Sequence, residues 1–387
     1  MYTQLNSTRG FIMRDATQFN WGPGIFLITY QILFLLTFPF YLYYYPIHLS
    51  TILVSIILLY ATGLSITGGY HRYFSHRTYK THPIIESVLL FFGAMAGQGS
   101  ALRWSFDHRQ HHAFVDTDKD PYSIKKGFWY AHFLWILEKP RTIDPKTVPD
   151  LINNPRVMFQ NRYSALLMLF SNVIVFFVVG WSLNDYMGAF FIACWARLFT
   201  LHHFTWFINS LAHTWGDKPF SQEQTAVDNY FISFLTFGEG YHNYHHTFAN
   251  DYRNGVRWYH FDPTKWLIWT LSKLGLAHNL KKMDPLTIKK RMVVEHKNLL
   301  IEHLSKLWSD KKSDLEKQVQ EISEKLLDQL NTFQKLTETY RHAKLEDSAI
   351  SLIADMNQQM KEIKKNLKRD WRNWKALSDR ILREQLA

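Results

Sequence analysis

A long uncharged stretch near the N-terminus places the strongest constraint on the fold. From Ala16 to Tyr70 the sequence contains no Lys, Arg, Asp or Glu. Two apolar segments lie within it, at about 25–45 and 50–69, with a short link around Pro46. Because about 20 apolar residues span a bilayer, this pattern predicts a hairpin of two transmembrane helices. A pair of helices buried in a large soluble core is the alternative.

A second apolar hairpin is predicted at about 165–181 and 186–207, joined by residues 182–185. Its last segment carries Arg197 and His202. These polar side chains should face protein or a cavity because they are costly in lipid. The sequence therefore predicts an all-α fold with four transmembrane helices in two hairpins.

The charge distribution predicts how these hairpins are oriented. Neither link between paired spans contains Lys or Arg, whereas 71–163 and the region after 213 are rich in both. The positive-inside rule then places both termini and every histidine cluster on the cytosolic side, in a helical cap. The apolar segment 84–101 is broken by glycines, and we interpret it as an in-plane or cavity-lining helix. A span there would separate the histidine clusters.

Composition narrows the classes of protein. Aromatic residues make up 16% of the chain, with 14 tryptophans, which suits membrane interfaces. The net charge of +11 suits anionic lipid or an anionic substrate, and no nucleic-acid-binding module is present, so no nucleic-acid partner is expected. The single cysteine, Cys194, excludes disulfides and cysteine-ligated iron–sulfur clusters within one chain.

Three regions are predicted. Residues 1–20 form an N-terminal cytosolic segment without the pattern of a signal peptide. Residues 21–285 form the membrane domain, and 286–387 a charged helical extension without proline or glycine. Apolar residues recur there every three or four positions, as in an amphipathic or coiled-coil-like helix. The extension could pack on the cytosolic domain, self-associate or lie on lipid; the basic segment Lys361–Arg369 favours an anionic surface.

The chemistry is expected at clustered histidines. Three imidazoles at i, i+3 and i+4 lie on one helix face, and neutral imidazole commonly binds iron, zinc and copper. One zinc takes four ligands, so nine indicate two metals, and an all-nitrogen pair beside a membrane suits redox-active iron. The nine clustered histidines are His71, His76, His108, His111, His112, His213, His242, His245 and His246.

Other polar residues could complete this site. Asn209 lies one helical turn before His213 and could supply an oxygen or hold a water ligand. Four acidic residues near the clusters could accept the distal imidazole N–H groups, although ordinary surface or capping roles are the alternative. These residues are Asp107, Asp116, Asp120 and Glu239.

The sequence resembles the integral-membrane acyl-CoA desaturases of the stearoyl-CoA Δ9 type. The similar segments are Gly69–Tyr79, Asp107–His112, Gly238–Phe248 and Asn209–His213, and the resemblance covers roughly residues 20–280. It implies that the nine histidines bind two irons (Fe2+/Fe3+), with Asn209 acting through water.

The resemblance also implies a reaction. An enzyme of this kind inserts a cis double bond, here at Δ9, into a saturated fatty acyl-CoA. It uses O2 and two electrons from an external carrier, either cytochrome b5-like or ferredoxin- or rubredoxin-like, with its reductase. No His-Pro-Gly-Gly segment is present, so no bound haem is expected.

Substrate-binding residues follow from the same resemblance. Gln98, Trp104, Thr205 and Trp206 fall where the acyl tunnel bends, although ordinary packing is their alternative role. Arg162 is a candidate for the CoA phosphates. The family has a basic residue just before the second box, where this chain has Phe106.

Two other hypotheses stay open. One is a hydroxylase or lipid-linked acyl desaturase of the same histidine-box superfamily. The other is a metal-binding membrane receptor or channel without catalysis. The absence of a haem segment suggests a bacterial inner membrane as the location.

Overall fold

The computed structural model describes residues 19–306, 311–346 and 349–383. The predicted N-terminal segment 1–20 therefore lies outside the described residues, apart from Phe19 and Asn20. The described chain is mostly helical, as predicted, with one antiparallel ladder that pairs β1 (Lys80–Thr81) with β2 (Ala277–His278). It forms two compact units. The first contains residues up to Asp217 and Gln224–Lys281, and the second contains Lys218–Glu223 and the chain from Lys282 onward.

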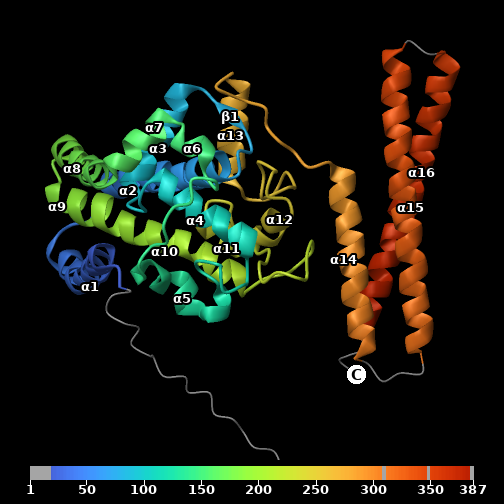
Figure 1. Ribbon diagram of the computed structural model, residues 1–387, viewed down its shortest axis with the longest axis horizontal. Coiled ribbons are helices and arrows are strands. Elements are labelled where there is room, and N and C mark those ends of the chain that lie inside the picture. The colour runs from blue at the N-terminus through green and yellow to red at the C-terminus, as the bar shows by residue number, and fades with distance from the viewer. Residues whose placement is uncertain (1–18, 307–310, 347–348, 384–387) are drawn as a thin grey trace, which may run out of the picture. The chain divides into compact units, whose positions relative to one another are not determined.

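The first unit holds the apolar helices and all the histidine clusters (Figure 1). Its helices are α1 (Trp21–Tyr44), α2 (Leu49–Leu64), η2 (Ser65–Ser75), α3 (Pro83–Met95), α4 (Ala101–Phe114), η3 (Ile124–Lys126), α5 (Phe128–His132), η4 (Leu134–Leu137), α6 (Pro149–Ile152), α7 (Pro155–Arg162), α8 (Ser164–Leu183), α9 (Tyr186–Gly188), η5 (Ala189–Ala196), α10 (Arg197–Asn209), η6 (Leu211–His213), α11 (Tyr230–Leu235), α12 (His242–Thr247) and α13 (Pro263–Lys273).

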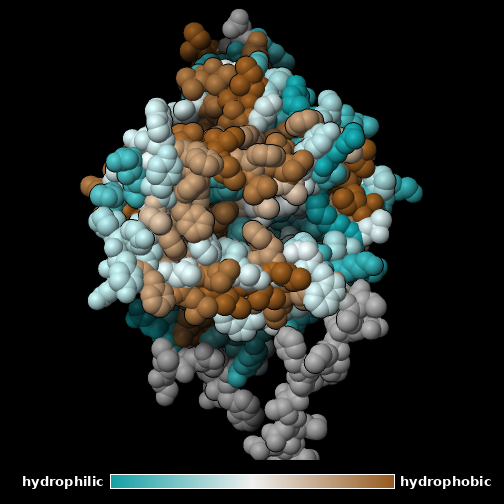
Figure 2. All heavy atoms as spheres, turned by 90° about the vertical axis from the view of Figure 1, so that its left-hand side faces the viewer, coloured by the Kyte–Doolittle hydropathy of each residue, from teal (hydrophilic) through white to brown (hydrophobic). Residues whose placement is uncertain are grey.

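Three helices of the described chain are long and apolar enough to cross a membrane. They are Trp21–Tyr44, Leu49–Ser75 and Ser164–Leu183. Many of their large apolar side chains are exposed; Trp181, for example, is 79% exposed. Figure 2 shows the face of the first unit near α8 and α1, where hydrophobic residues cover broad areas. Apolar surface on this scale is stable against lipid rather than water.

The fourth predicted span, 186–207, is helical from Tyr186 to Asn209 but is not among these three. Its polar residues explain the difference. Arg197 is only 1% exposed and donates through Nε to the Ala193 carbonyl and through Nη2 to Asn172 Oδ1. The polar groups of this helix therefore face protein, as expected for a helix at membrane depth.

Close contact between α3 and η2 positions the first two histidine boxes. A side chain at Gly93 would lie 2.4 Å from the Tyr70 ring, so only glycine permits this approach. The loop after α3 then leads into α4, whose first turn is capped by Ser100. Its Oγ accepts a hydrogen bond from the Arg103 N–H at 3.2 Å. Helix α4 packs on η2, which brings the second box against the first.

The second unit consists mainly of α14 (Pro285–Ser305), α15 (Lys312–Leu345) and α16 (Ile350–Arg383), with α15 and α16 side by side (Figure 1). The apolar repeat predicted a helical extension, and the described residues are indeed helical. The breaks between the helices were not predicted, because no proline or glycine marks them. The core of this unit contains Val293, Leu300, Leu304, Leu315, Val319, Leu326, Leu330, Trp374, Leu377 and Ile381.

We expect Trp374→Ala to destabilise this unit strongly. Trp374 is 3% exposed, and its indole N–H donates to His296 Nδ1 at 3.1 Å. Deleting a buried Trp side chain costs about 3–5 kcal/mol. Limited proteolysis of the full-length protein in increasing urea measures the loss. The matched control is Trp371→Ala, since Trp371 is only partly buried. Equal stability of Trp374→Ala and wild type would contradict this core.

Candidate metal centre

The first histidine box depends on an unusual helical geometry. In an α-helix, residues five apart point about 140° away from each other. Residues 65–75 instead form a π-helix, in which i and i+5 are linked by a hydrogen bond. The His76 N–H donates to the His71 carbonyl at 3.1 Å, and the two ring centroids are 4.8 Å apart. The π-turn therefore places both imidazoles on the same side.

The other histidines come from three short helical pieces. The second box lies on α4, the third on α12, and His213 ends η6. Helix α12 is held from its polar side: Asn243 Nδ2 donates to the Ala226 carbonyl at 3.0 Å, and the Tyr244 N–H donates to Asp228 Oδ1 at 3.0 Å. These contacts hold α12 in place, and its imidazoles meet those of α4, where His245 and His246 lie beside His112 and His111.

The nine histidines form two groups in the described part of the chain. Within each group the candidate ligand atoms all lie within 4.8 Å of one another. The groups adjoin, because the His112 and His246 rings stack at 4.3 Å. One group contains His71, His76, His108, His112 and His245, and the other contains His111, His213, His242 and His246.

Each of the second and third boxes is divided between the groups. In the second box, His108 and His112 join one group while His111 joins the other. In the third box, His242 and His246 stay together and His245 crosses over. In both boxes the two histidines four residues apart share a group and the third joins the other group, although residues three and four apart are both neighbours on a helix face.

Partners behind the rings set their orientation. His111 Nδ1 lies 2.9 Å from Asp120 Oδ1, and His71 Nδ1 lies 2.9 Å from Glu239 Oε2. A carboxylate only accepts, so the His111 Nδ1–H donates to Asp120, and the Nε2 atoms of His71 and His111 are the ones that face other histidines. These Nε2 atoms point inward: His245 Nε2 lies 3.0 Å from the Nε2 atoms of both His71 and His112.

Two further rings are held through hydroxyl groups. His108 Nδ1 lies 3.1 Å from the Tyr122 hydroxyl. His213 Nδ1 lies 2.7 Å from Thr225 Oγ1, which itself donates to Asp116 Oδ1 at 2.6 Å. The Thr225 hydroxyl therefore accepts a hydrogen bond from the His213 imidazole and donates one to the Asp116 carboxylate. Of the four acidic residues suggested by the sequence, Asp120 and Glu239 contact imidazoles, Asp116 acts through Thr225, and Asp107 pairs with Arg103.

The surroundings favour the neutral form of six of these imidazoles. Burial, followed by the proximity of the other histidines, lowers the pKa of six of them well below the ordinary value; these are His76, His108, His112, His242, His245 and His246. A neutral imidazole offers the lone pair that a metal needs. Buried nitrogen donors with inward lone pairs, in groups of four and five, fit two metal ions.

A cavity of about 720 Å³ reaches the first histidine group, since His71, His108 and Glu239 line it. Four of the predicted substrate residues, Gln98, Trp104, Thr205 and Trp206, line the same cavity, as does Asn209. Gln98 Nε2 donates to Thr205 Oγ1 at 2.8 Å, and the Trp104 ring stacks on His108 with a centroid separation of 5.0 Å.

Arg162 is placed differently. It ends α7, is exposed, and lies over the Tyr163 ring at 5.5 Å; it is not among the described residues that line the cavity. The bases that do line it are Arg103, Lys139 and Arg141, which the sequence did not single out. Arg103 also lies 5.3 Å from the ring of Phe106, the position where the resemblance expected a base. The i, i+4 spacing of Arg103 and Asp107 was the sequence feature that could have drawn attention to Arg103.

His202 and His203 belong to neither histidine group. His202 Nε2 donates to the Ala96 carbonyl at 2.9 Å, and its Nδ1 accepts from the Tyr30 hydroxyl at 2.5 Å. His203 Nδ1 lies 3.0 Å from His132 Nε2. Both rings are therefore engaged within helix packing.

We expect Asp120→Ala to weaken metal binding about 10- to 100-fold, the usual cost of losing a partner behind a ligand. The change leaves the His111 Nδ1 proton without its acceptor. Calorimetric titration of the apoprotein with Fe2+ under anaerobic conditions measures the affinity. Asp118→Ala, an exposed neighbour, is the control. Wild-type affinity in Asp120→Ala would contradict this role.

These features define a class: a helical protein with membrane-length apolar helices and nine clustered histidines able to hold metal ions beside a cavity. Comparison with known proteins supplies the family. The family model described as fatty acid desaturase matches residues 49–280, more than half of the chain. The chain belongs to the fatty acid desaturase family.

Individual relatives agree with this assignment. The chain is 45% identical over 267 residues to a probable acyl-CoA desaturase of Schizosaccharomyces pombe. The match covers 68% of this chain and 55% of that protein. It is 39% identical over 277 residues to acyl-CoA desaturase 1 of Saccharomyces cerevisiae, in a match that covers 70% of this chain and 54% of that protein. It is 37% identical over 229 residues to the sn-2 palmitoyl-lipid 9-desaturase of a Nostoc species, in a match that covers 58% of this chain and 78% of that protein. The chain thus spans little more than half the length of the two yeast proteins, and the resemblance predicted from the boxes is confirmed.

Proposed function

We propose that this protein is a membrane-bound fatty acyl-CoA desaturase that inserts a cis double bond at the Δ9 position, using O2 and two electrons. One observation supports the proposal: a cavity of about 720 Å³ is lined by apolar residues and by His71 and His108 of the five-histidine group, so an acyl chain bound there would present a methylene to that group. The names of the yeast relatives support acyl-CoA as the substrate.

Two irons would be held by the nine histidines, with Asn209 acting through a water molecule. Bound iron supplies the O2 chemistry that removes hydrogens from a methylene pair, which offers no acid–base handle. The protein contributes neutral imidazoles with fixed orientation and a buried site. Asp120, Glu239 and the Thr225–Asp116 pair hold the rings in place.

The cavity residues would select the reacting carbon by holding the acyl chain in one orientation. Trp104 stands beside the site, with its ring 5.0 Å from that of His108 and 6.1 Å from that of His71. Gln98 and Thr205, which also line the cavity, are joined by a hydrogen bond. Arg103, Lys139 and Arg141 supply positive charge for the CoA phosphates, and Arg162 remains an additional candidate on the surface.

The membrane arrangement proposed here has four spans, including 186–207, with both termini and the histidines on the cytosolic side. The electron donor would be a separate carrier, cytochrome b5-like or ferredoxin- or rubredoxin-like, reduced by its own reductase and attracted by the basic charge. A bacterial inner membrane and self-association through the C-terminal helices remain predictions.

A lipid-linked acyl desaturase is the second candidate. The Nostoc relative, a palmitoyl-lipid desaturase, is matched over 78% of its length. The three bases along the cavity favour a substrate with anionic phosphates, such as acyl-CoA. A hydroxylase of the same superfamily would give a product with added oxygen instead of lost hydrogen.

Expression in a host that lacks its own desaturase tests the proposal. We expect monounsaturated fatty acids with the double bond at Δ9. Purified protein supplied with iron, an electron carrier and either acyl-CoA or acyl-lipid identifies the substrate by mass spectrometry. Unchanged acyl chains under these conditions would refute a desaturase.

A further inference from the structure

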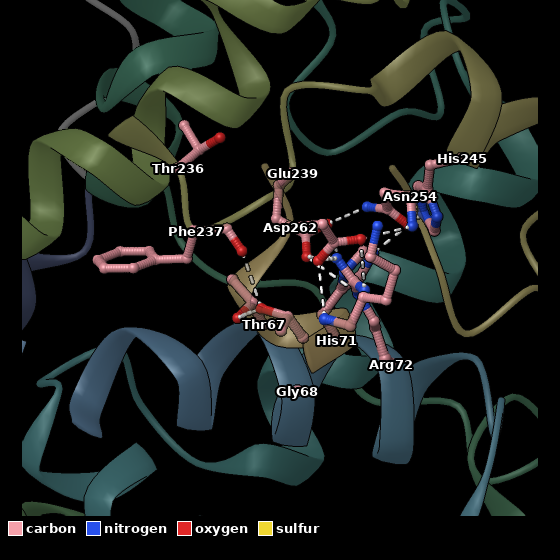
Figure 3. Close-up of polar contacts among 12 residues, drawn as sticks. Thr67, Gly68, His71, Arg72, Thr236, Phe237, Glu239, His245, Asn254 and Asp262 are labelled. Atoms are coloured by element: carbon pink, nitrogen blue, oxygen red, sulfur yellow. Dashed lines mark hydrogen bonds and ion pairs between the residues drawn. The ribbon is translucent and has the colours of Figure 1, made fainter. Parts of the chain in front are cut away.

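A buried ion cluster links the first histidine box to the third (Figure 3). Arg72 follows His71 in η2, is 1% exposed, and lies between the carboxylates of Glu239 and Asp262. Its Nε and Nη2 donate to Glu239 Oε1 at 3.2 and 2.9 Å, and its Nη1 and Nη2 donate to Asp262 at 3.1 and 3.0 Å. Nη1 also donates to the Tyr252 carbonyl at 2.8 Å. All five N–H groups of the guanidinium therefore have an acceptor.

Glu239 connects this cluster to the histidines. Its Oε1 faces Arg72, while its Oε2 lies 2.9 Å from His71 Nδ1 and accepts from Asn254 Nδ2 at 2.6 Å. Figure 3 shows Glu239 and Asn254 directed toward the His71 and Arg72 side chains. Because Arg72 holds Oε1 through two N–H groups, the carboxylate cannot rotate without losing both bonds. Oε2 therefore stays opposite the imidazole.

Asp262 fixes the other side of Arg72. Its Oδ2 accepts from the backbone N–H groups of Asn254 and Gly255 at 3.0 Å each, and its Oδ1 caps α13 by accepting from the Lys265 N–H at 2.8 Å. Gly238 permits this approach, since it has φ of +101° and a side chain there would lie 2.5 Å from Asp262 Oδ1. Asp262, which holds Arg72, is thus itself fixed by three backbone N–H groups.

We propose that Arg72 is a positioning residue for the metal centre, which acts through Glu239 on His71 and is itself held by Asp262. The inference rests on the proposed metal centre and adds a residue to it. A planar guanidinium can bind two carboxylates at once, whereas the point charge of lysine cannot. The alternative is a purely structural ion cluster that ties η2 to α13. The two interpretations differ in what they predict for metal affinity.

Arg72→Lys separates them. The apoprotein, purified in detergent, is titrated with Co2+ under anaerobic conditions and followed by visible absorption, and its melting temperature is recorded. The matched control is Arg109→Lys. Arg109 forms a similar fork to Asp150, at 2.7 and 2.8 Å, and donates to the Phe74 carbonyl, but Asp150 contacts no histidine in the described chain.

We expect Arg72→Lys to bind one of two Co2+ ions about 10- to 100-fold more weakly, with a changed absorption spectrum. Arg109→Lys should keep wild-type Co2+ affinity even if it melts earlier. If Arg72→Lys does not fold, Asp262→Asn replaces it, because the amide oxygen can still cap α13; a smaller loss in the same direction is expected. Wild-type affinity in Arg72→Lys or Asp262→Asn, or an equal loss in Arg109→Lys, would overturn the inference. Wild-type protein that binds no Co2+ would refute the metal centre itself.

Discussion

His245→Ala is expected to abolish desaturation and to lower the bound iron. His245 Nε2 lies 3.0 Å from the Nε2 atoms of both His71 and His112, so it is central to the five-histidine group. Alanine removes a nitrogen donor without altering the apolar helices. The four histidines of the other group retain their ligand atoms, so the iron content should fall from two toward one per chain rather than to zero.

Iron per chain and double-bond formation are measured on the same purified sample. His278→Ala is the matched control, because His278 is exposed on β2 and belongs to neither group. Circular dichroism checks that the helices are retained. Normal desaturation by His245→Ala would contradict the assignment of this histidine.

Much of this site could be predicted from residue spacing. The nine histidines were identified because short-range spacing on a helix places side chains on one face. All nine converge in the structure. The uncharged stretch likewise predicted the first apolar hairpin. Both of its helices, Trp21–Tyr44 and Leu49–Ser75, are long and apolar enough to span a membrane.

The division of the boxes could not be read from spacing. A rotation of about 100° per residue separates His111 from His108, but which neighbour each ring meets depends on how α4 and α12 pack. The sequence also gave no signal for the π-helix that brings His71 and His76 together. Its cause is tertiary, since α3 and α4 pack tightly on η2.

The bases along the cavity were missed for a related reason. Lys139 and Arg141 lie far in sequence from the histidine boxes, in a segment without helical periodicity, and only chain folding brings them to the cavity. The breaks in the C-terminal extension were missed because no proline or glycine marks them. Sequence patterns report local geometry well and long-range placement poorly.

Ala94→Phe is expected to shorten the acyl chain that the protein accepts while leaving iron bound. Ala94 lines the cavity and is 3% exposed. It lies two residues before Ala96, whose carbonyl accepts from His202, and His202 precedes Asn209 by seven residues on α10, about 10 Å along the helix axis. We therefore expect a phenyl ring at position 94 to meet the far end of a long chain rather than the carbons beside the histidines.

Competition between stearoyl-CoA and lauroyl-CoA measures this effect. Overpacking costs about 1–3 kcal/mol, so the preference for the longer chain should fall about tenfold or more. Ala94→Ser, which keeps the volume small, should behave as wild type, and iron content in both variants should match wild type because Ala94 belongs to neither histidine group. This outcome separates the cavity from the metal centre: His245→Ala loses both iron and activity, whereas Ala94→Phe loses only the long substrate. An unchanged ratio of the two products in Ala94→Phe, with iron retained, would show that the acyl chain does not reach this end of the cavity.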